Sequence, residues 1–262
     1  MIVALIDSGL GLLPTAAWLR KLRPDLDLLL LNDPDGAPWG PKPEQWVIDR
    51  VLDIARLALG EGAEVIVLPC NTASVQALEH VRTMVGPGVP VIGTVPAIKP
   101  AAAACRKVAV WATAATTASA YQADLIARFG GDADITGVAC HGLADAIDRG
   151  DLPVIADAIA DAAARTPADT EGIVLGCTHY PLVLDDILTA LPPGVRVFDS
   201  AEAVAGQTLR RMDALERPTA GTSTGTVHVL ASGRAAQLPT AAATFESGRL
   251  LGATAADRLT IS

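Results

Sequence analysis

Short apolar runs alternate with longer amphipathic stretches along most of this chain, and most of the apolar runs end near Gly, Pro, Asp or Asn. This alternation is typical of repeated βα units and predicts the α/β class with parallel sheets. Apolar residues at three- and four-residue spacing predict helices over 45–59 and 152–164. The predicted strands lie at 3–6, 28–32, 65–69, 89–93, 108–112, 135–139, 172–176 and 195–199.

The pattern also repeats within the chain. VALIDSG begins at Val3 and VAVWATA at Val108, an offset of 108 − 3 = 105. CNTAS at 70–74 and CTHYP at 177–181 each follow an apolar run, and their cysteines are 177 − 70 = 107 residues apart. The distance from a polar residue at a strand end to the cysteine is also similar, with 70 − 7 = 63 from Asp7 and 177 − 113 = 64 from Thr113. The sequence therefore predicts two similar, doubly wound lobes related by a pseudo-twofold axis.

The end of the chain is expected to return to the first lobe. A helix is predicted from near Ala203, followed by the Gly/Thr-rich linker 219–226 and a strand-helix unit beginning VHVLASG at 227. The predicted first lobe is 1–96 plus 207–262, and the second is 97–206. Ligands of open α/β sheets bind outside the carboxyl ends of the strands, so the expected active site is the cleft between the lobes.

Composition and charge exclude several classes of partner. With 29 acidic against 20 basic residues the formal charge is −9, which disfavours nucleic acid and anionic membranes as partners. The N-terminus lacks a basic segment before its apolar run, and no apolar run approaches the ~20 residues that cross a bilayer. Four cysteines without a CxxC pair argue against a zinc site or a disulfide scaffold. We expect a soluble, cytoplasmic protein with reduced thiols and no metal.

Cys70 and Cys177 are the candidate reactive groups. A cysteine in a loop entering a helix lies in a field that favours anions and lowers the thiol pKa. Asp7 and His179 are the nearest candidate proton partners. A single cysteine at a strand end is more often a small buried apolar residue, and Asp7-Ser8-Gly9 could be only a turn and a helix cap. The recurrence of the cysteine at equivalent points of a duplicated fold favours chemistry. Cys105 and Cys140 are expected to serve packing alone.

The motifs occur in the order found in a known family. They are IDSGLG (6–11), the stretch from Asp33 through APWGPKP (37–43), CNTAS (70–74), VPVIGTVPAIKPA (89–101), ATAATTASAY (112–121) and GCTHYP (176–181). With these motifs the sequence resembles the glutamate racemase branch of the cofactor-independent aspartate/glutamate racemases, over most of the chain.

The resemblance implies a mechanism with two thiols and no cofactor. Cys70 would act on the D-enantiomer with assistance from Asp7, and Cys177 on the L-enantiomer with assistance from His179. It also implies a homodimer that supplies D-glutamate to peptidoglycan. The residues implied to contact the amino-acid substrate are Ser8, Pro38, Trp39, Gly40, Asn71, Thr72, Thr113 and Thr178.

Some positions depart from the family pattern. Trp39 replaces a Tyr beside the expected side-chain pocket, Leu12 and Ala201 each replace a Gly, and the stretch 139–147 lacks a usual Pro. A racemase of the same fold that acts on aspartate or another amino acid therefore remains an alternative. Two others are a non-catalytic protein that binds an acidic amino acid and a thiol redox module, the latter disfavoured by the missing CxxC spacing.

Overall fold

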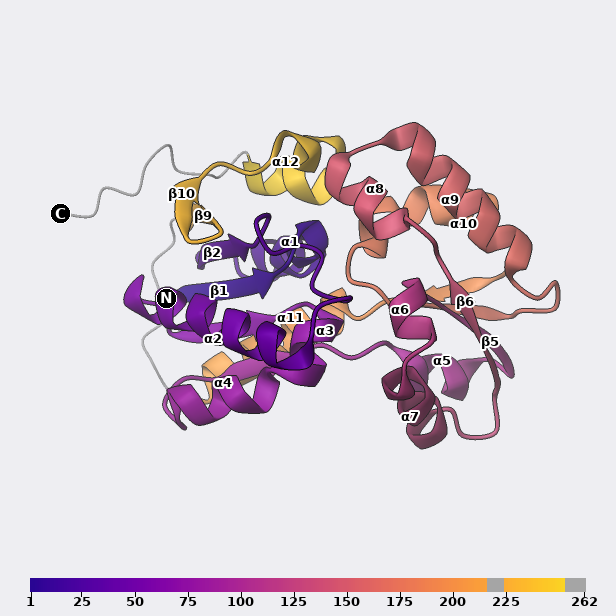
Figure 1. Cartoon of the computed structure of the whole chain (residues 1–262), viewed down its shortest axis with the longest axis horizontal. Helices are drawn as coiled ribbons and strands as arrows, with labels where there is room; N and C mark the ends of the chain where they lie inside the picture. Colours follow the sequence, from indigo (N-terminus) through magenta and orange to yellow (C-terminus); the bar gives the residue numbers. More distant parts are fainter. Residues whose placement is uncertain (216–223, 253–262) are drawn as a thin grey trace. The chain divides into compact units, whose positions relative to one another are not determined.

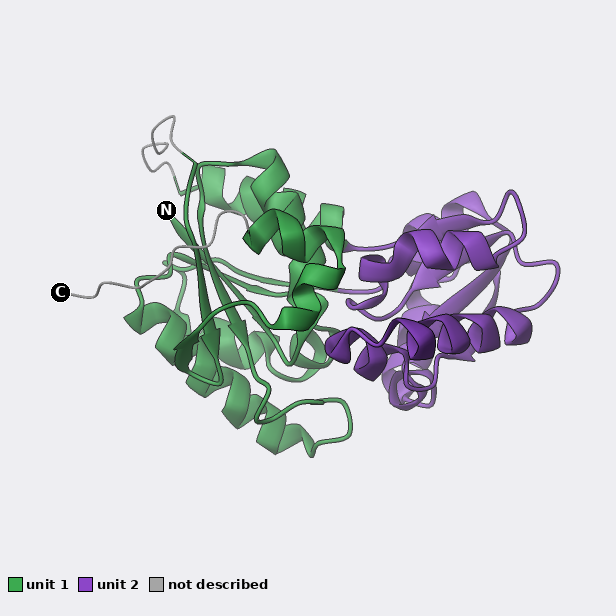
Figure 2. Cartoon of the chain, turned by 90° about the horizontal axis from the view of Figure 1, so that it is seen from above, with its two compact units in different colours: residues 1–94, 201–262 green, residues 95–200 purple. Residues whose placement is uncertain are grey.

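The computed structural model describes residues 1–215 and 224–252, and within them the chain divides into two compact units. Unit 1 comprises Met1–Thr94 and Ala201–Ser262, and unit 2 comprises Val95–Ser200 (Figure 2). Unit 1 is therefore discontinuous in sequence. Residues 219–223 of the predicted linker lie outside the described residues.

Unit 1 is built on a six-stranded sheet with the order β10-β9-β2-β1-β3-β4. Figure 1 labels β10, β9, β2 and β1 of this sheet. The strands pair in parallel except for β10, which is antiparallel to β9. Strand β9, from the end of the chain, pairs with β2 and so returns the chain to this sheet. The strands are β1 (Ile2–Asp7), β2 (Asp27–Asn32), β3 (Val65–Leu68), β4 (Val91–Gly93), β9 (Val227–Ala231) and β10 (Arg234–Ala236).

Helices pack on both faces of this sheet. One apolar cluster joins alternate residues of β1, β2 and β3 to α2, α3 and α4, while α1 packs against α11 and α12. The core is formed mainly by Ala, Val, Leu and Ile, which suits a parallel sheet covered on both faces. The helices are η1 (Leu10–Leu12), α1 (Leu13–Leu22), α2 (Glu44–Gly60), α3 (Asn71–Gln76), α4 (Leu78–Val85), α11 (Ala201–Asp213), η3 (Thr240–Thr244) and α12 (Glu246–Gly252).

Unit 2 contains a four-stranded parallel sheet with the order β6-β5-β7-β8. An apolar cluster joins β5 and β7 to α5 and α7, and α9 packs against α8 and α10. The strands are β5 (Lys107–Ala112), β6 (Asp134–Ala139), β7 (Gly172–Leu175) and β8 (Arg196–Phe198). The helices are α5 (Ile98–Ala104), α6 (Ala114–Thr117), α7 (Ala120–Phe129), α8 (Leu143–Arg149), α9 (Leu152–Arg165), η2 (Tyr180–Val183) and α10 (Leu184–Ala190).

The two sheets share strand order and register. The order β2-β1-β3-β4 of unit 1 corresponds to β6-β5-β7-β8 of unit 2. Val3 pairs with Val65 in unit 1, and Val108 pairs with Gly172 in unit 2. These partners differ by 108 − 3 = 105 and 172 − 65 = 107, the same offsets that the sequence repeat shows. Residues at these offsets are called register-equivalent below.

All eight strands and both helices predicted from the hydrophobic pattern are confirmed, with ends that differ by one or two residues. The prediction did not include β10. Its three residues are all exposed and lack an apolar alternation, so the sequence carries no strand signal there.

Candidate functional site

In unit 1, Asp7 and Cys70 lie at the same edge of the sheet. Asp7 is the last residue of β1, and Cys70 follows the end of β3, the neighbouring strand, and occupies the N-cap position of α3. Both residues are buried, and Cys70 is 6% exposed. The backbone N–H of Ser8 donates to Asp7 Oδ1 at 2.7 Å, which holds the carboxylate against its own turn. This edge therefore presents a thiol and a carboxylate from adjacent parallel strands.

Ser74 fixes the turn that carries Cys70. Its hydroxyl donates to the carbonyl of Leu68 at 2.8 Å and accepts from the N–H of Thr94 at 2.8 Å. The CNTAS segment is thus tied to the ends of both β3 and β4. Asn71 and Thr72, between the thiol and this anchor, are partly exposed at the same edge. This role of Ser74 was not predicted from the sequence.

The loop after β2 carries three of the predicted substrate contacts. Pro38 and Gly40 are exposed, whereas Trp39 between them is 1% exposed and packs in the apolar cluster of this unit. The peptide bond between Ala37 and Pro38 is cis. The Trp39 ring therefore points inward within this unit, whereas Pro38 and Gly40 on either side of it face outward.

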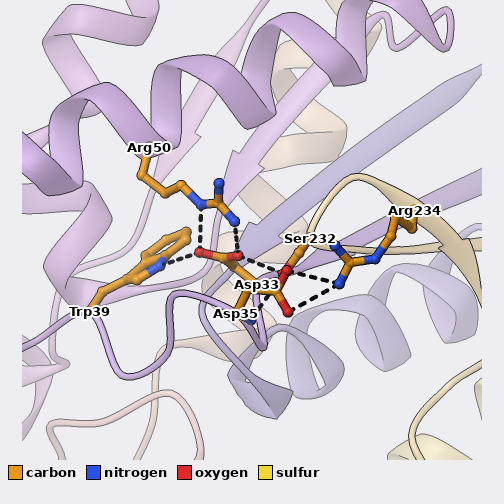
Figure 3. A network of polar contacts seen from close by, with 6 residues as sticks. All are labelled: Asp33, Asp35, Trp39, Arg50, Ser232 and Arg234. Carbon is orange, nitrogen blue, oxygen red and sulfur yellow. Dashed lines mark hydrogen bonds and ion pairs between the residues drawn. The ribbon is translucent and has the colours of Figure 1, made fainter.

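A buried carboxylate holds the inner side of this loop. Asp33 accepts hydrogen bonds from Trp39 Nε1 at 2.9 Å, from Arg50 Nε at 2.8 Å and from the Ser232 hydroxyl at 2.8 Å, and it also pairs with the second guanidinium nitrogen of Arg50 (Figure 3). We call these four residues the Asp33 cluster. Burial alone would raise the pKa of Asp33, but the donors outweigh it and the pKa lies below its ordinary value.

In unit 2, Cys177 lies at the equivalent edge of the sheet, two residues after β7. Its Sγ is 3.7 Å from His179 Nδ1, and His179 Nε2 is 3.0 Å from Asp148 Oδ1 of α8. Cys177 is partly exposed and His179 is buried. The arrangement is a thiol, an imidazole and a carboxylate in series, which suits proton transfer at sulfur.

The electrostatics of His179 follow from this arrangement. Burial is the largest influence and lowers its pKa, but Asp148 and Cys177 together outweigh burial, so the pKa of His179 lies well above its ordinary value. The positive form of the ring is therefore favoured beside the thiol, and such a neighbour stabilises a thiolate. Asp148 was not identified from the sequence, because 179 − 148 = 31 residues separate it from its partner.

The predicted contacts Thr113 and Thr178 also lie at this edge of unit 2. Thr178 is partly exposed beside Cys177. Thr113 follows β5 and caps α6, where its hydroxyl accepts from the N–H of Thr116 at 3.3 Å. By register, Asp7 corresponds to Ala112 and not to Thr113, because 112 − 7 = 105. The similar spacings of Asp7 and Thr113 to their cysteines therefore do not reflect equivalent backbone positions.

The other two cysteines are buried in unit 2. Burial raises the pKa of the Cys140 thiol to about 12, and the neighbouring Tyr180 only partly opposes this shift. The Sγ of Cys105 would lie 2.8 Å from a Cβ added at Gly172, so it fills the space over that glycine. Both positions fit packing roles.

The two residues that replace a Gly of the family pattern are interior. Leu12 in η1 is 2% exposed and Ala201 at the start of α11 is 5% exposed.

Within the described ranges 1–215 and 224–252, no group of three or more His, Cys, Asp or Glu side chains is placed to hold a metal ion. No helix in this part of the chain combines the length and apolar character that spanning a bilayer requires.

Comparison with known proteins gives a consistent result. The family model described as Asp/Glu/Hydantoin racemase matches residues 15–208. The chain is 36% identical to a glutamate racemase of Pectobacterium carotovorum subsp. carotovorum, with 87% of this chain and 82% of that protein covered. It is 37% identical to a glutamate racemase of Pseudomonas syringae pv. tomato, with 79% of this chain and 77% of that protein covered.

Solved structures agree. The crystal structure of Escherichia coli glutamate racemase, in complex with L-glutamate and the activator UDP-MurNAc-ala, superposes with a TM-score of 0.76 at 30% identity, covering 93% of this chain and 91% of that chain. Glutamate racemase from Thermus thermophilus, in complex with beta-chloro-D-alanine, gives a TM-score of 0.71 at 30% identity, covering 97% and 94%.

Proposed function

Because the chain belongs to the Asp/Glu/Hydantoin racemase family of isomerases, we propose that it interconverts L- and D-glutamate without a cofactor, using Cys70 and Cys177 as the two acid–base groups. The observation that carries this proposal is the placement of the two thiols. Each follows the register-equivalent strand of its unit, β3 or β7, at the carboxyl edge of a parallel sheet. Ligands of such sheets bind at that edge.

In the proposed reaction one thiolate breaks the α-C–H bond and becomes a thiol. The electron pair remains on the α-carbon, and the opposite thiol donates its proton to the other face. Cys70 would take the proton from D-glutamate and Cys177 from L-glutamate. The mechanism requires a single α-carbon to be reached by both sulfur atoms.

The two thiols would be assisted by different groups. His179, held by Asp148, would stabilise the thiolate of Cys177 as an imidazolium. Asp7 would exchange a proton with Cys70 from the neighbouring strand. We propose that Ser8, Pro38, Gly40, Asn71, Thr72, Thr113 and Thr178 contact the substrate, because they lie near the carboxyl edges of the two sheets or in the loop that follows β2.

Glutamate is proposed as the substrate because the related enzymes are named glutamate racemases and the E. coli structure holds L-glutamate. The presence of Trp39 in place of the family's Tyr was the main reason to consider aspartate as the substrate. The inward orientation of its ring weakens that reason. A panel of amino acids monitored by circular dichroism, without added cofactor, decides between them: faster racemisation of aspartate than of glutamate would change the assigned substrate.

The two-thiol mechanism is tested with Cys70→Ser and Cys177→Ser. Each variant should lose at least about a thousandfold in kcat, because a serine hydroxyl is a much weaker acid–base group at neutral pH. In D₂O, Cys70→Ser should still exchange the α-proton of L-glutamate slowly, and Cys177→Ser that of D-glutamate. Full racemase activity in either variant would exclude the mechanism. Binding of glutamate by the wild-type protein with no deuterium uptake would indicate a non-catalytic binding protein.

We also propose that the protein acts in the cytoplasm as a homodimer and supplies D-glutamate to peptidoglycan. These proposals rest on the family and on its relatives. Light scattering in solution tests the dimer. Growth of a strain that depends on added D-glutamate, once this chain is expressed in it, tests the biological role.

A further inference from the structure

We infer that the Asp33 cluster is a positioning device for the loop that carries Pro38 and Gly40, and that Ser232, from the hairpin near the end of the chain, completes it. The inference rests on the proposed function, in which Pro38 and Gly40 contact the substrate. It assigns Trp39 a role in holding the loop and no contact with substrate.

The Asp33 cluster brings together side chains from three separate parts of unit 1 around the carboxylate of Asp33. Asp33 follows β2, Arg50 lies in α2 and Ser232 follows β9, and all three side chains converge with Trp39 (Figure 3). Asp33 is fully buried. A buried carboxylate with donors from several directions has one low-energy position, so whatever is bonded to it is fixed.

Trp39 transmits this fixation to the loop. Its indole N–H donates to Asp33 Oδ2 at 2.9 Å, and its exposed neighbours Pro38 and Gly40 lie on either side. The backbone restrains both ends, because Ala37 N–H donates to the Asp33 carbonyl at 2.9 Å and Lys42 N–H donates to the Trp39 carbonyl at 3.0 Å. With the ring anchored inside, the groups presented outward are the flanking residues.

The cluster is also joined to the first strand end. The backbone N–H of Asp33 donates to the carbonyl of Ser8 at 3.2 Å, and Ser8 donates to Asp7. A shift of Asp33 would therefore move the loop relative to the edge that holds Asp7 and Cys70.

Ser232 shows backbone strain that points to a side-chain role. Its φ of 46° lies in the left-handed region, where glycine is favoured over other residues. Its hydroxyl donates to Asp33 Oδ1 at 2.8 Å and accepts from the N–H of Asp35 at 3.0 Å. Glycine would suit the backbone better but would lose both contacts. The serine is thus explained by its hydroxyl and not by its conformation.

Because of this strain, a substitution at Ser232 can test the effect on substrate binding separately from the effect on stability. In Ser232→Gly the backbone is relieved while the hydroxyl is lost, so the melting temperature should stay close to the wild-type value. KM for both enantiomers of glutamate should rise about three- to tenfold, with kcat changed less than twofold, because binding geometry is lost and the thiols are untouched. Trp39→Phe keeps an aromatic ring, removes the N–H and should raise KM in the same way.

Arg234→Ala is the matched control. Arg234 lies in the same hairpin and pairs with Asp35 at 2.8 Å, but both side chains are more than half exposed and neither belongs to the Asp33 cluster. This variant should keep the wild-type KM. A merely structural cluster would lower the melting temperature of the variants without changing KM when they are assayed well below that temperature.

Isothermal titration of D-glutamate gives the same comparison without turnover when each variant, and the wild type, also carries Cys70→Ser, so that the ligand is not racemised. A wild-type KM in Ser232→Gly and Trp39→Phe, or an equal rise in Arg234→Ala, overturns the inference while leaving the proposed function intact. Wild-type protein that binds D-glutamate but does not racemise it overturns the proposed function, and the titrations still decide the inference. Wild-type protein that neither racemises nor binds glutamate overturns both.

Discussion

Cys70 in unit 1 and Cys177 in unit 2 follow register-equivalent strands, yet the polar groups beside them come from different places. In unit 1 the strand next to the thiol ends in Asp7, and the residue two after the cysteine is Thr72. In unit 2 the corresponding strand ends in Ala112, and the residue two after the cysteine is His179. Each unit thus has an ionisable neighbour where the other has a neutral residue.

The difference extends to the residue after the next strand. Asp33 follows β2, and its register-equivalent is Cys140, because 140 − 33 = 107. Asp33 gathers Trp39, Arg50 and Ser232 around a buried charge, whereas Cys140 is a buried thiol with a raised pKa. The two units therefore share the register of their strands but not the positions of their charged residues. The two thiols lie at equivalent backbone positions beside different ionisable neighbours, Asp7 in unit 1 and His179 in unit 2.

The largest difference in stability between the two units is expected when Asp33 and its register-equivalent Cys140 are each replaced by alanine. Asp33→Ala leaves a guanidinium, an indole N–H and a hydroxyl without their shared acceptor and should lower the free energy of unfolding of unit 1 by about 3–5 kcal/mol. Cys140→Ala removes only a small apolar group from unit 2 and should cost about 1 kcal/mol. Hydrogen exchange measured by mass spectrometry in urea reads each unit separately. Equal losses would show that the units do not differ in this respect.

The loss of unfolding free energy in Asp33→Ala should become smaller as the pH falls. The pKa of Asp33 is lowered in the native protein, because its donors outweigh burial. Its charge therefore stabilises the fold fully above the ordinary carboxyl pKa of about 3.8 and progressively less as the pH falls through the lower native value. The difference between wild type and Asp33→Ala should shrink in acid. A difference that is constant down to pH 2 would contradict a charged Asp33.

The next largest loss of stability is expected in the loop after Asp33, where the backbone of unit 1 differs from that of unit 2. After Asp33 the chain forms an open loop, whereas the register-equivalent stretch after Cys140 leads directly into α8. A Cβ added at Gly36 would overlap Asp33 Oδ2 and lie 2.8 Å from the Trp46 ring. Because Asp33 is held by its donors, Gly36→Ala should cost about 1–3 kcal/mol of unfolding free energy. Gly60→Ala, at a site with nothing within 4 Å, is the control and should not destabilise. Equal urea midpoints would contradict a rigid cluster.

These differences mark the limit of what the sequence predicts. The strands and the two long helices were predictable, because apolar periodicity is a local property. The alternation of strands with helices then indicates parallel pairing. Cys70, Cys177, Asp7 and His179 stood out as motifs near strand ends. The partners that organise them did not, because Asp148 lies 31 residues before His179, and Ser232 lies 232 − 33 = 199 residues after Asp33. Contacts of that kind depend on the register of packed elements, which a single sequence does not specify.

Trp39 illustrates the same limit. From the sequence it is a larger ring in the place of a tyrosine, and the direction of the side chain is unknown. In the structure its N–H finds a buried carboxylate, and a buried indole needs such a partner. The presence of Asp33 six residues earlier was visible, but nothing in the spacing showed that the loop folds back on it.

A smaller effect should distinguish the proton partner of unit 2. Asp148→Asn removes a charge that helps to raise the pKa of His179, so that pKa should fall and kcat should drop about tenfold. The stabilisation from the His179–Asp148 pair is present below the ordinary histidine pKa of about 6.5 and is lost as the pH rises through the higher native value. NMR titration of the imidazole measures the shift. Asp157→Asn, on the exposed side of α9, is the control, and an unchanged His179 titration in Asp148→Asn would refute the pairing.

The smallest effect is expected where the units should behave alike, at their surface ion pairs. Arg56 pairs with Asp53 in α2 of unit 1 at 2.6 Å, and Arg128 pairs with Asp124 in α7 of unit 2 at 3.1 Å. All four side chains are more than half exposed, so water screens the charges and the side chains lose entropy on pairing. Arg56→Ala and Arg128→Ala should each change the free energy of unfolding by no more than about 0.5 kcal/mol, and the change should diminish further in 0.5 M salt. Urea unfolding at low and high salt measures both. If either variant lost as much stability as Gly36→Ala, exposed charges would contribute as much as the buried cluster, and the contrast between the units could not be assigned to Asp33.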